Sequence, residues 1–145
     1  AVDQVEEEMY SLLLGYNFKK EKDLSYLASF HARFEQIHPF ADGNGRVGRL
    51  LLYKECLKEG ITPFIVDDTR KADYYNALEQ FQVYDNHQPL IDYFVSEQKF
   101  YTNYLKNKGF EGKINDSKDR DTIKKKSKII EDSSKKQATN KGLSL

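Results

Sequence analysis

The sequence predicts an all-α fold, and three observations carry this prediction. Apolar residues recur at intervals of three and four along most of the first 105 residues, which is the period of an amphipathic helix. Nothing in the chain reads as strand-rich. The glycine, proline and asparagine clusters that stop a helix fall between the periodic stretches. A chain of 145 residues suits one domain, and we expect five or six helices.

The first two helices are expected over residues 2–14 and 24–37, separated by "GYNFKKEKD". Each places its apolar residues on one face: Val5, Met9, Leu12 and Leu13 on the first, and Leu24, Leu27, Phe30, Phe34 and Ile37 on the second. Asp23 or Ser25 is a suitable N-cap for the second helix. This helix must end near His38, because a residue before proline is disfavoured in the α region.

Helical periodicity resumes in "RVGRLLLYKECLKEG" and ends at Gly60, a good residue for the C′ position. The residues expected to share one side of this helix are Val47, Leu50, Tyr53 and Leu57. "ITPFIVDD" is a short connector. Further helices are expected over residues 69–84 and 90–108, separated by "DNHQP".

The charge of the chain is divided between two regions. Residues 1–105 carry a net charge of −6 and residues 106–145 a net charge of +6. We therefore expect a helical domain over residues 1–105 and a basic tail over residues 106–145, with a helical extension followed by solvated disorder. Attraction to nucleic acid or to a membrane is the alternative for the tail. The lack of interleaved aromatic residues disfavours nucleic acid.

Composition excludes several classes of protein. Cys56 is the only cysteine, which excludes a disulfide framework and favours a reducing, cytoplasmic location. No apolar run approaches the roughly 20 residues that a membrane helix needs. The N-terminal sequence "AVDQVEEEMY" lacks a signal-peptide pattern. Delivery into another cell stays open beside the cytoplasmic expectation.

The loop "HPFADGNGR", residues 38–46, has the residues of an anion site. Gly43 and Gly45 flank Asn44, and glycines let backbone N–H groups point toward a guest at a helix N-terminus. Arg46 and Arg49 lie three residues apart in the first turns, on one helix face. Positive charge there opposes the helix dipole by about 0.3–1 kcal/mol for each residue. A bound phosphate would offset this cost.

Two further residues of the loop complete a reactive group. Asp42 would be repelled by a polyphosphate unless a cation lay between them, and Mg²⁺ takes one or two protein carboxylates plus substrate phosphates. His38 supplies a group that accepts a proton near neutral pH. Together these residues describe transfer from a nucleotide phosphate to a hydroxyl.

Each of these residues also has a purely structural interpretation: a structural histidine, a Gly-Asn-Gly turn, a carboxylate cap and solvated arginines. Their conjunction within twelve residues favours the site. An EF-hand fails at Arg46, Val47 and Tyr53, and a P-loop would need Lys-Ser or Lys-Thr after the glycine. No Cys/His spacing suggests zinc. His31, two turns before His38, is expected to have a structural role rather than to be a ligand, and His87 is expected to be exposed.

The stretch "HPFADGNGRVGR", His38 to Arg49, matches the signature H-P-F-x-[D/E]-G-N-G-R-x-x-R of the Fic family (filamentation induced by cAMP) at every fixed position. The flanks "FHARFEQIHPF" and "DYYNALEQF" are also similar to Fic proteins, so the resemblance covers about residues 24–95. It implies a Fic-type helical bundle with the motif loop between two central helices. It also implies transfer of AMP from ATP to a Tyr, Thr or Ser hydroxyl of a target protein, or of the protein itself.

The resemblance implies a role for each motif position. His38 would be the general base, Asp42 the Mg²⁺ ligand, and Phe40 a buried anchor. The phosphate-binding residues would be Gly43, Asn44 (including its side chain), Gly45, Arg46 and Arg49. Tyr75 would line the nucleotide pocket. Doc-type relatives that phosphorylate their target carry a lysine in place of the first arginine, so Gly45-Arg46 favours AMP transfer.

Two features depart from the family pattern. Family members usually place a β-hairpin "flap" before the motif, whereas the residues before His38 read as helix and linker, so we expect the flap to be absent or short. Many members also carry an inhibitory helix, [S/T]-x-x-x-E-[G/N], which Ser127 to Glu131 matches only in part. The alternatives are therefore a nucleotide-binding or interaction module with weak or no transfer, transfer of another phosphate-linked donor, or removal of AMP.

Overall fold

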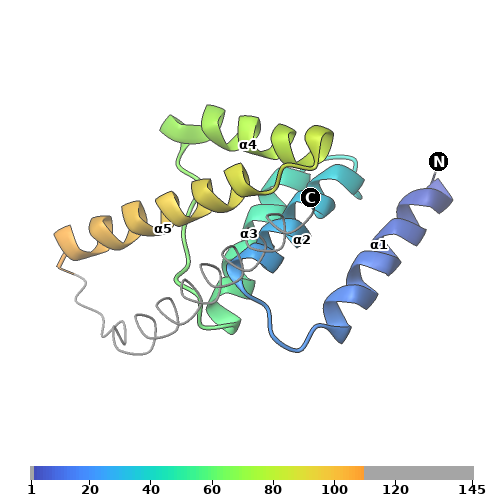
Figure 1. Ribbon diagram of the computed structural model, residues 1–145, viewed down its shortest axis with the longest axis horizontal. Helices are drawn as coiled ribbons and strands as arrows, with labels where there is room; N and C mark the ends of the chain where they lie inside the picture. The colour runs from blue at the N-terminus through green and yellow to red at the C-terminus, as the bar shows by residue number, and fades with distance from the viewer. Residues whose placement is uncertain (1, 110–145) are drawn as a thin grey trace, which may run out of the picture. The chain divides into compact units, whose positions relative to one another are not determined.

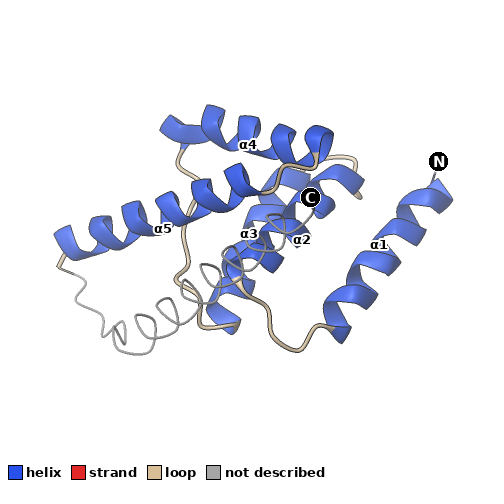
Figure 2. Cartoon of the chain, viewed as in Figure 1, coloured by secondary structure: helices blue, strands red, loops and turns tan. Residues whose placement is uncertain are grey.

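The computed structural model describes residues 2–109, and Ala1–Lys108 forms one compact unit. Its elements are α1 (Val2–Phe18), α2 (Leu24–Ile37), α3 (Asn44–Lys58), the 3₁₀ helix η1 (Asp68–Arg70), α4 (Lys71–Tyr84) and α5 (Gln88–Asn107). No strand occurs within residues 2–109 (Figures 1 and 2). The predicted all-α fold is therefore confirmed. Residues 110–145 lie outside the described residues, so the domain boundary at residue 105 stays a prediction. The partial match to an inhibitory helix, Ser127 to Glu131, also lies outside them.

The helix ends follow the predicted signals. The Asp23 side chain caps α2 by accepting a hydrogen bond of 2.9 Å from the Tyr26 N–H. His38 ends α2 in the left-handed region, with φ of 55°. Gly60 takes φ of 69° after α3, and the Ile61 N–H donates to the Cys56 carbonyl at 2.8 Å. Helix α1 is longer than predicted, since it continues through Gly15 to Phe18.

Helix α2 is the centre of the unit, because it contacts α1, α3, α4 and α5. Figure 1 shows α2 and α3 in the middle, with α1 on one side and α4 and α5 on the other. The core between these helices is mainly apolar and aromatic; its largest fully buried apolar side chains are Leu27, Tyr74, Leu90 and Phe94. None of the helices in residues 2–109 has both the length and the hydropathy to cross a membrane.

The side of α3 on which Val47, Leu50, Tyr53 and Leu57 were expected to lie is not the side that packs into the core. Leu50 is 68% exposed and Leu57 is 56% exposed, while the buried residues of this helix are Asn44, Gly48, Leu52, Glu55 and Cys56. Helix α3 carries apolar residues on several sides, so their spacing alone does not distinguish its faces. Leu13, on the predicted apolar face of α1, is likewise 47% exposed.

The buried face of α3 is set by a close approach to α2 at Gly48. A Cβ atom at Gly48 would collide with Glu35 Oε1 and lie 3.1 Å from Phe34 Cδ1. Such a distance is shorter than ordinary van der Waals contact. The missing side chain of Gly48 therefore lets α2 lie directly against α3.

A polar contact ties α1 to α3. The Tyr16 hydroxyl donates a hydrogen bond to Glu55 Oε2, and the ammonium groups of Lys54 and Lys58 lie 2.9 Å and 3.5 Å from the Glu55 carboxylate. Glu55 is buried, so these partners satisfy a carboxylate that would otherwise be costly to remove from water.

We predict that Gly48→Ala lowers the free energy of unfolding by about 1–3 kcal/mol, because the added methyl group must displace Glu35 and Phe34. Urea unfolding would measure the change. Gly15→Ala in α1 is the control, since a Cβ there meets no atom within 4 Å. The control should gain up to about 1 kcal/mol from helix propensity. Equal effects of the two substitutions would contradict the close approach.

Candidate functional site

The motif loop is anchored by the buried side chain of Asn44, which is 2% exposed. Its Oδ1 accepts a hydrogen bond of 2.8 Å from the Phe40 N–H, and its Nδ2 donates one of 2.6 Å to the Phe40 carbonyl. Both ends of the amide are thus engaged by the backbone of the loop. The side chain therefore shapes the loop, and its expected contact with phosphate stays a prediction.

The expectation that Phe40 is a buried anchor is wrong for its side chain. Its side chain is 48% exposed rather than buried, with its ring centroid 6.3 Å from that of Phe34. Phe40 anchors the loop through its backbone N–H and carbonyl, which Asn44 holds. The motif indicated that Phe40 fixes the loop, but not that its backbone does so.

The N-terminus of α3 offers backbone donors. Gly43 has φ of 83°, and its carbonyl accepts the first helical hydrogen bond, 2.9 Å from the Val47 N–H. The N–H groups of Asn44, Gly45 and Arg46 precede this bond, which is the arrangement that binds anions at helix N-termini. The Gly43 N–H instead donates to Asp42 Oδ1 at 2.6 Å.

The charged side chains on the outside of the loop are open to solvent. Arg46 Nη2 lies 3.2 Å from Asp42 Oδ2, and these side chains are 75% and 92% exposed. Residues 2–109 contain no group of three or more His, Cys, Asp and Glu side chains that could hold a metal ion. Asp42 is a carboxylate of this loop that is open to solvent, and Mg²⁺ can be held by one protein carboxylate with phosphates and water as the other ligands.

His38 stands at the junction of α2 and the loop. Its backbone N–H donates to the Phe34 carbonyl at 3.1 Å, and its side chain is exposed. An incoming hydroxyl can therefore reach this imidazole from solvent. His38 follows the last turn of α2 and lies one turn beyond Glu35.

Arg49 is half-buried and lies between Gly45, Glu35 and Tyr74. A Cβ atom at Gly45 would lie 3.0 Å from Arg49 Nη1 and 3.9 Å from Glu35 Oε2, so both charged groups border this glycine. Burial raises the pKa of the Glu35 carboxyl, while the Arg49 guanidinium and the His38 ring act in the opposite direction. Burial raises the pKa of the Tyr74 hydroxyl above its usual range, and the Arg49 guanidinium acts in the opposite direction.

Beneath Arg49 lies a buried polar pair, His31 and Tyr74, each 1% exposed. His31 Nε2 is 2.7 Å from the Tyr74 hydroxyl, and Nδ1 is 3.2 Å from the Gly48 carbonyl. Burial lowers the pKa of His31 to about 4; Arg49 adds to this, and the Gly48 carbonyl opposes it. The ring is therefore neutral at pH 7. The expected structural role of His31 agrees with this position.

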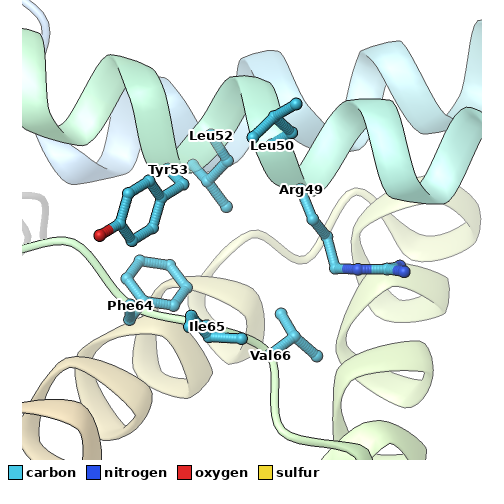
Figure 3. A pocket seen from close by; sticks show the side chains of 7 residues that line it. All are labelled: Arg49, Leu50, Leu52, Tyr53, Phe64, Ile65 and Val66. Atoms are coloured by element: carbon cyan, nitrogen blue, oxygen red, sulfur yellow. The ribbon is translucent and has the colours of Figure 1, made fainter.

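An apolar pocket of about 330 Å³ lies on the other side of Arg49, between α3 and the segment that follows it (Figure 3). Its lining residues are Arg49, Leu50, Leu52, Tyr53, Phe64, Ile65 and Val66. The Arg49 guanidinium lies at the end of the pocket away from the Tyr53 hydroxyl. Tyr75 does not line this pocket; it is 54% exposed on α4, with its ring 5.3 Å from that of Tyr74.

The structure thus brings His38, Asp42, the α3 N-terminus, Arg46 and Arg49 together around one short loop. Sequence reasoning missed Glu35 and Tyr74, which both border Arg49. Glu35 had a signal, because it lies one turn before His38 on the same helix. Tyr74 comes from a helix separated from the motif by more than twenty residues, and nothing local distinguished it from Tyr75.

We predict that Asn44→Ala lowers the free energy of unfolding by about 1–3 kcal/mol, because it leaves the Phe40 N–H and carbonyl without their buried partner. Faster amide hydrogen exchange at Phe40 would locate the effect in the loop. Asn86→Ala, at an exposed asparagine, should change stability by less than about 0.5 kcal/mol. An unchanged exchange rate at Phe40 would contradict the proposed role of the two hydrogen bonds between the Asn44 side chain and the Phe40 backbone.

We predict that stability falls as the pH is lowered from about 6.5 to 4 because of His31. The unfolded chain takes up a proton near pH 6.5, whereas the folded ring stays neutral to about pH 4. Protons thus favour the unfolded state in this window, by up to about 3 kcal/mol. Urea unfolding at several pH values would show a flatter profile for His31→Gln. Glu35 and Arg49, which lie near the ring, remain in both proteins, so identical profiles would contradict this origin.

Comparison with known proteins agrees with this site. Residues 1–56, which include the motif, match the model of the Fic/DOC family. The chain is 38% identical over 56 residues to proteins named "Protein adenylyltransferase Fic" from Drosophila mojavensis, Drosophila grimshawi and Drosophila melanogaster. The match covers 39% of this chain and 11%, 12% and 11% of these relatives, so the chain matches about a ninth of their length. These comparisons confirm, for residues 1–56, the resemblance to the Fic family that the motif predicted.

Proposed function

We propose that the chain is a protein adenylyltransferase, which transfers AMP from Mg-ATP to a Tyr, Thr or Ser hydroxyl of a target protein. The observation that carries the proposal is the position of the solvent-open His38, which enters the same clamped loop that leads to the N-terminus of α3. A proton acceptor and an anion site are thus held within one loop. The name of the similar Drosophila proteins supports the same reaction.

In this scheme the triphosphate lies at the N-terminus of α3. The N–H groups of Asn44, Gly45 and Arg46 bind phosphate oxygens, and the guanidinium groups of Arg46 and Arg49 bind the outer phosphates. Asp42 would hold Mg²⁺, which supplies neutralisation of charge on the phosphates. Arg46 must exchange Asp42 for phosphate, and this costs little because exposed ion pairs are weak.

The chemical step needs one base. His38 takes the proton of the target hydroxyl while the oxygen of that hydroxyl forms a bond to the α-phosphorus of ATP. The bond between the α-phosphorus and the oxygen that bridges it to the β-phosphorus breaks, and pyrophosphate leaves. In-line placement and stabilisation of charge on the phosphates supply most of the catalysis in such transfers.

A second function is favoured by the all-helical chain before the motif. Between Val2 and Ile37 the structure places only α1 and α2 and the segment that joins them, and residues 2–109 contain no strand. A β-hairpin that aligns a target segment would therefore come from outside residues 2–109. Residues 2–109 alone would then hold the nucleotide with little or no transfer.

We predict that the protein labels itself or a lysate protein with α-³²P-ATP and Mg²⁺, and that His38→Ala lowers labelling by at least about 100-fold through loss of the base. His87→Ala is the matched control, since His87 is exposed, lies outside the motif, and stacks its ring on that of Phe81 with the centroids 4.0 Å apart. Full labelling by His38→Ala would contradict the proposed base. Label from γ-³²P-ATP would indicate phosphate transfer instead.

The same samples separate the two functions. Absence of label in every sample, together with ATP binding that weakens in Arg49→Ala, would support the binding module. Absence of both label and ATP binding would contradict both functions.

A further inference from the structure

We propose that the apolar pocket beside α3 binds a small aliphatic carboxylic acid, whose hydrocarbon chain fills the pocket and whose carboxylate pairs with Arg49. Binding of the acid is a property of the protein without nucleotide. The effect of the acid on ATP rests on the proposed function.

The pocket has the size and the lining of a small-molecule site. Its volume of about 330 Å³ lies within the range of about 300–1,000 Å³ that is usual for ligand pockets. Of its apolar lining residues, Leu52 and Phe64 are buried, whereas Leu50 and Ile65 are exposed. The pocket therefore joins a buried apolar interior to an edge through which a ligand enters from solvent. A hydrocarbon chain placed there is removed from water, which is favourable.

One wall of the pocket is the connector between α3 and η1, with the side chains of residues 64–66 (Figure 3). The beginning of this connector is fixed to α5. Gln98 Nε2 donates a hydrogen bond of 2.6 Å to the Thr62 carbonyl. The ring of Phe64 packs on that of Phe94, with the centroids 4.9 Å apart.

The segment after the wall, at η1, is fixed to the same part of α5. Arg70 Nη2 donates a hydrogen bond of 2.7 Å to Ser96 Oγ, and Arg70 Nη1 lies 2.8 Å from Glu97 Oε1. Glu97 is fully buried, so water screens this ion pair little. Because Ser96, Glu97 and Gln98 are consecutive, α5 holds the chain on both sides of residues 64–66. The wall is therefore in place before a ligand arrives, and binding does not require its ordering.

Arg49 is the only charged residue among those that line the pocket. Its guanidinium lies at one end of the pocket (Figure 3). Within residues 2–109, no carboxylate forms an ion pair with it. A guanidinium binds a carboxylate through two parallel hydrogen bonds. A ligand carboxylate at this end would therefore be neutralised and oriented, with its chain along the apolar lining.

Other classes of ligand fit this lining less well. Arg49 repels an organic cation. A neutral hydrocarbon leaves the guanidinium without an anion. A doubly charged phosphate ester needs several donors, and apart from Arg49 the side chains of the lining offer only the Tyr53 hydroxyl. The lining thus favours a monocarboxylate with an aliphatic chain.

The consequence concerns the affinity for ATP. In the proposed function, the Arg49 guanidinium binds an outer phosphate, and one guanidinium cannot pair fully with two anions at once. An acid in the pocket should therefore weaken binding of ATP. AMP has no outer phosphates, so the acid should leave binding of AMP unchanged. Through this pocket a carboxylic acid would lower AMP transfer.

The first test titrates the protein with sodium octanoate, without nucleotide, and follows the titration by ¹⁵N NMR. Saturable shifts are expected at the backbone amides of Ile65 and Val66 and at the Arg49 Nε–H. Octylammonium has the same chain and the opposite charge, and it should bind at least about tenfold more weakly because it makes no charge-assisted hydrogen bonds with Arg49. Absence of saturable shifts, shifts only outside the pocket, or equal affinity for the two probes would overturn the proposal.

Two variants test the charge and the wall separately. Arg49→Leu should raise the Kd for octanoate at least about tenfold, since it removes the cation and keeps an apolar side chain. Arg46→Leu is the matched control, because it removes the same charge from an exposed arginine outside the lining, and it should change this Kd by less than about twofold. Ile65→Ser, at an exposed position, should raise the Kd at least about threefold through loss of apolar contact. An unchanged Kd in Arg49→Leu or in Ile65→Ser would overturn the proposal.

The second test measures the coupling between the two ligands by isothermal titration. Saturating octanoate should raise the apparent Kd for ATP at least about threefold and leave that for AMP within about twofold. Because coupling is reciprocal, ATP should raise the Kd for octanoate by the same factor. An affinity for ATP that octanoate does not change would overturn the shared use of Arg49.

The two proposals fail in different ways. Absence of ATP binding, together with octanoate binding that Arg49→Leu weakens, would overturn the proposed function and leave the acid site supported. ATP binding without saturable octanoate shifts in the pocket would do the reverse.

Discussion

The arrangement of the site depends on the close approach of α2 and α3 at Gly48. Helix α2 contacts every other α-helix of the described unit, so its distance from α3 sets where the others lie relative to the motif. Any side chain at position 48 would push against Glu35 and Phe34. The same contact brings the Gly48 carbonyl to His31 and the Glu35 carboxylate toward Arg49. The contact at Gly48 therefore sets both the packing of α2 on α3 and the position of the Glu35 carboxylate.

The loop between these helices is fixed by its backbone rather than by its charged side chains. His38 turns the chain in the left-handed region, and Asn44 holds both polar groups of the Phe40 backbone. Asp42 and Arg46, in contrast, lie almost fully in water. A rigid backbone that presents mobile charges suits a ligand rich in phosphate, because the N–H donors are already oriented while the exposed charges adjust at little cost.

Much of the fold followed from local signals in the sequence. Asp23, His38 and Gly60 end or begin their helices through capping and backbone preferences that depend only on neighbouring residues. The inner face of α3 did not follow, because its apolar residues surround the helix and a glycine, not a leucine, marks the contact with α2. The motif indicated that these residues share one loop, but it did not indicate which of their side chains are buried. Burial of Asn44 and exposure of Phe40 depend on how the loop closes, and Tyr74 reaches the site only through tertiary packing.

The two arginines of the motif are not equivalent, although the sequence presents them as a pair. Arg46 faces water and has an exposed carboxylate as its partner, so it keeps its freedom until a ligand arrives. Arg49 is half-buried and borders Gly45 together with the Glu35 carboxylate, which belongs to α2. The buried Glu35 Oε1, which has no hydrogen-bond partner among the described residues, is unfavourable for stability, since an apolar side chain would fill the same space without a desolvated polar atom.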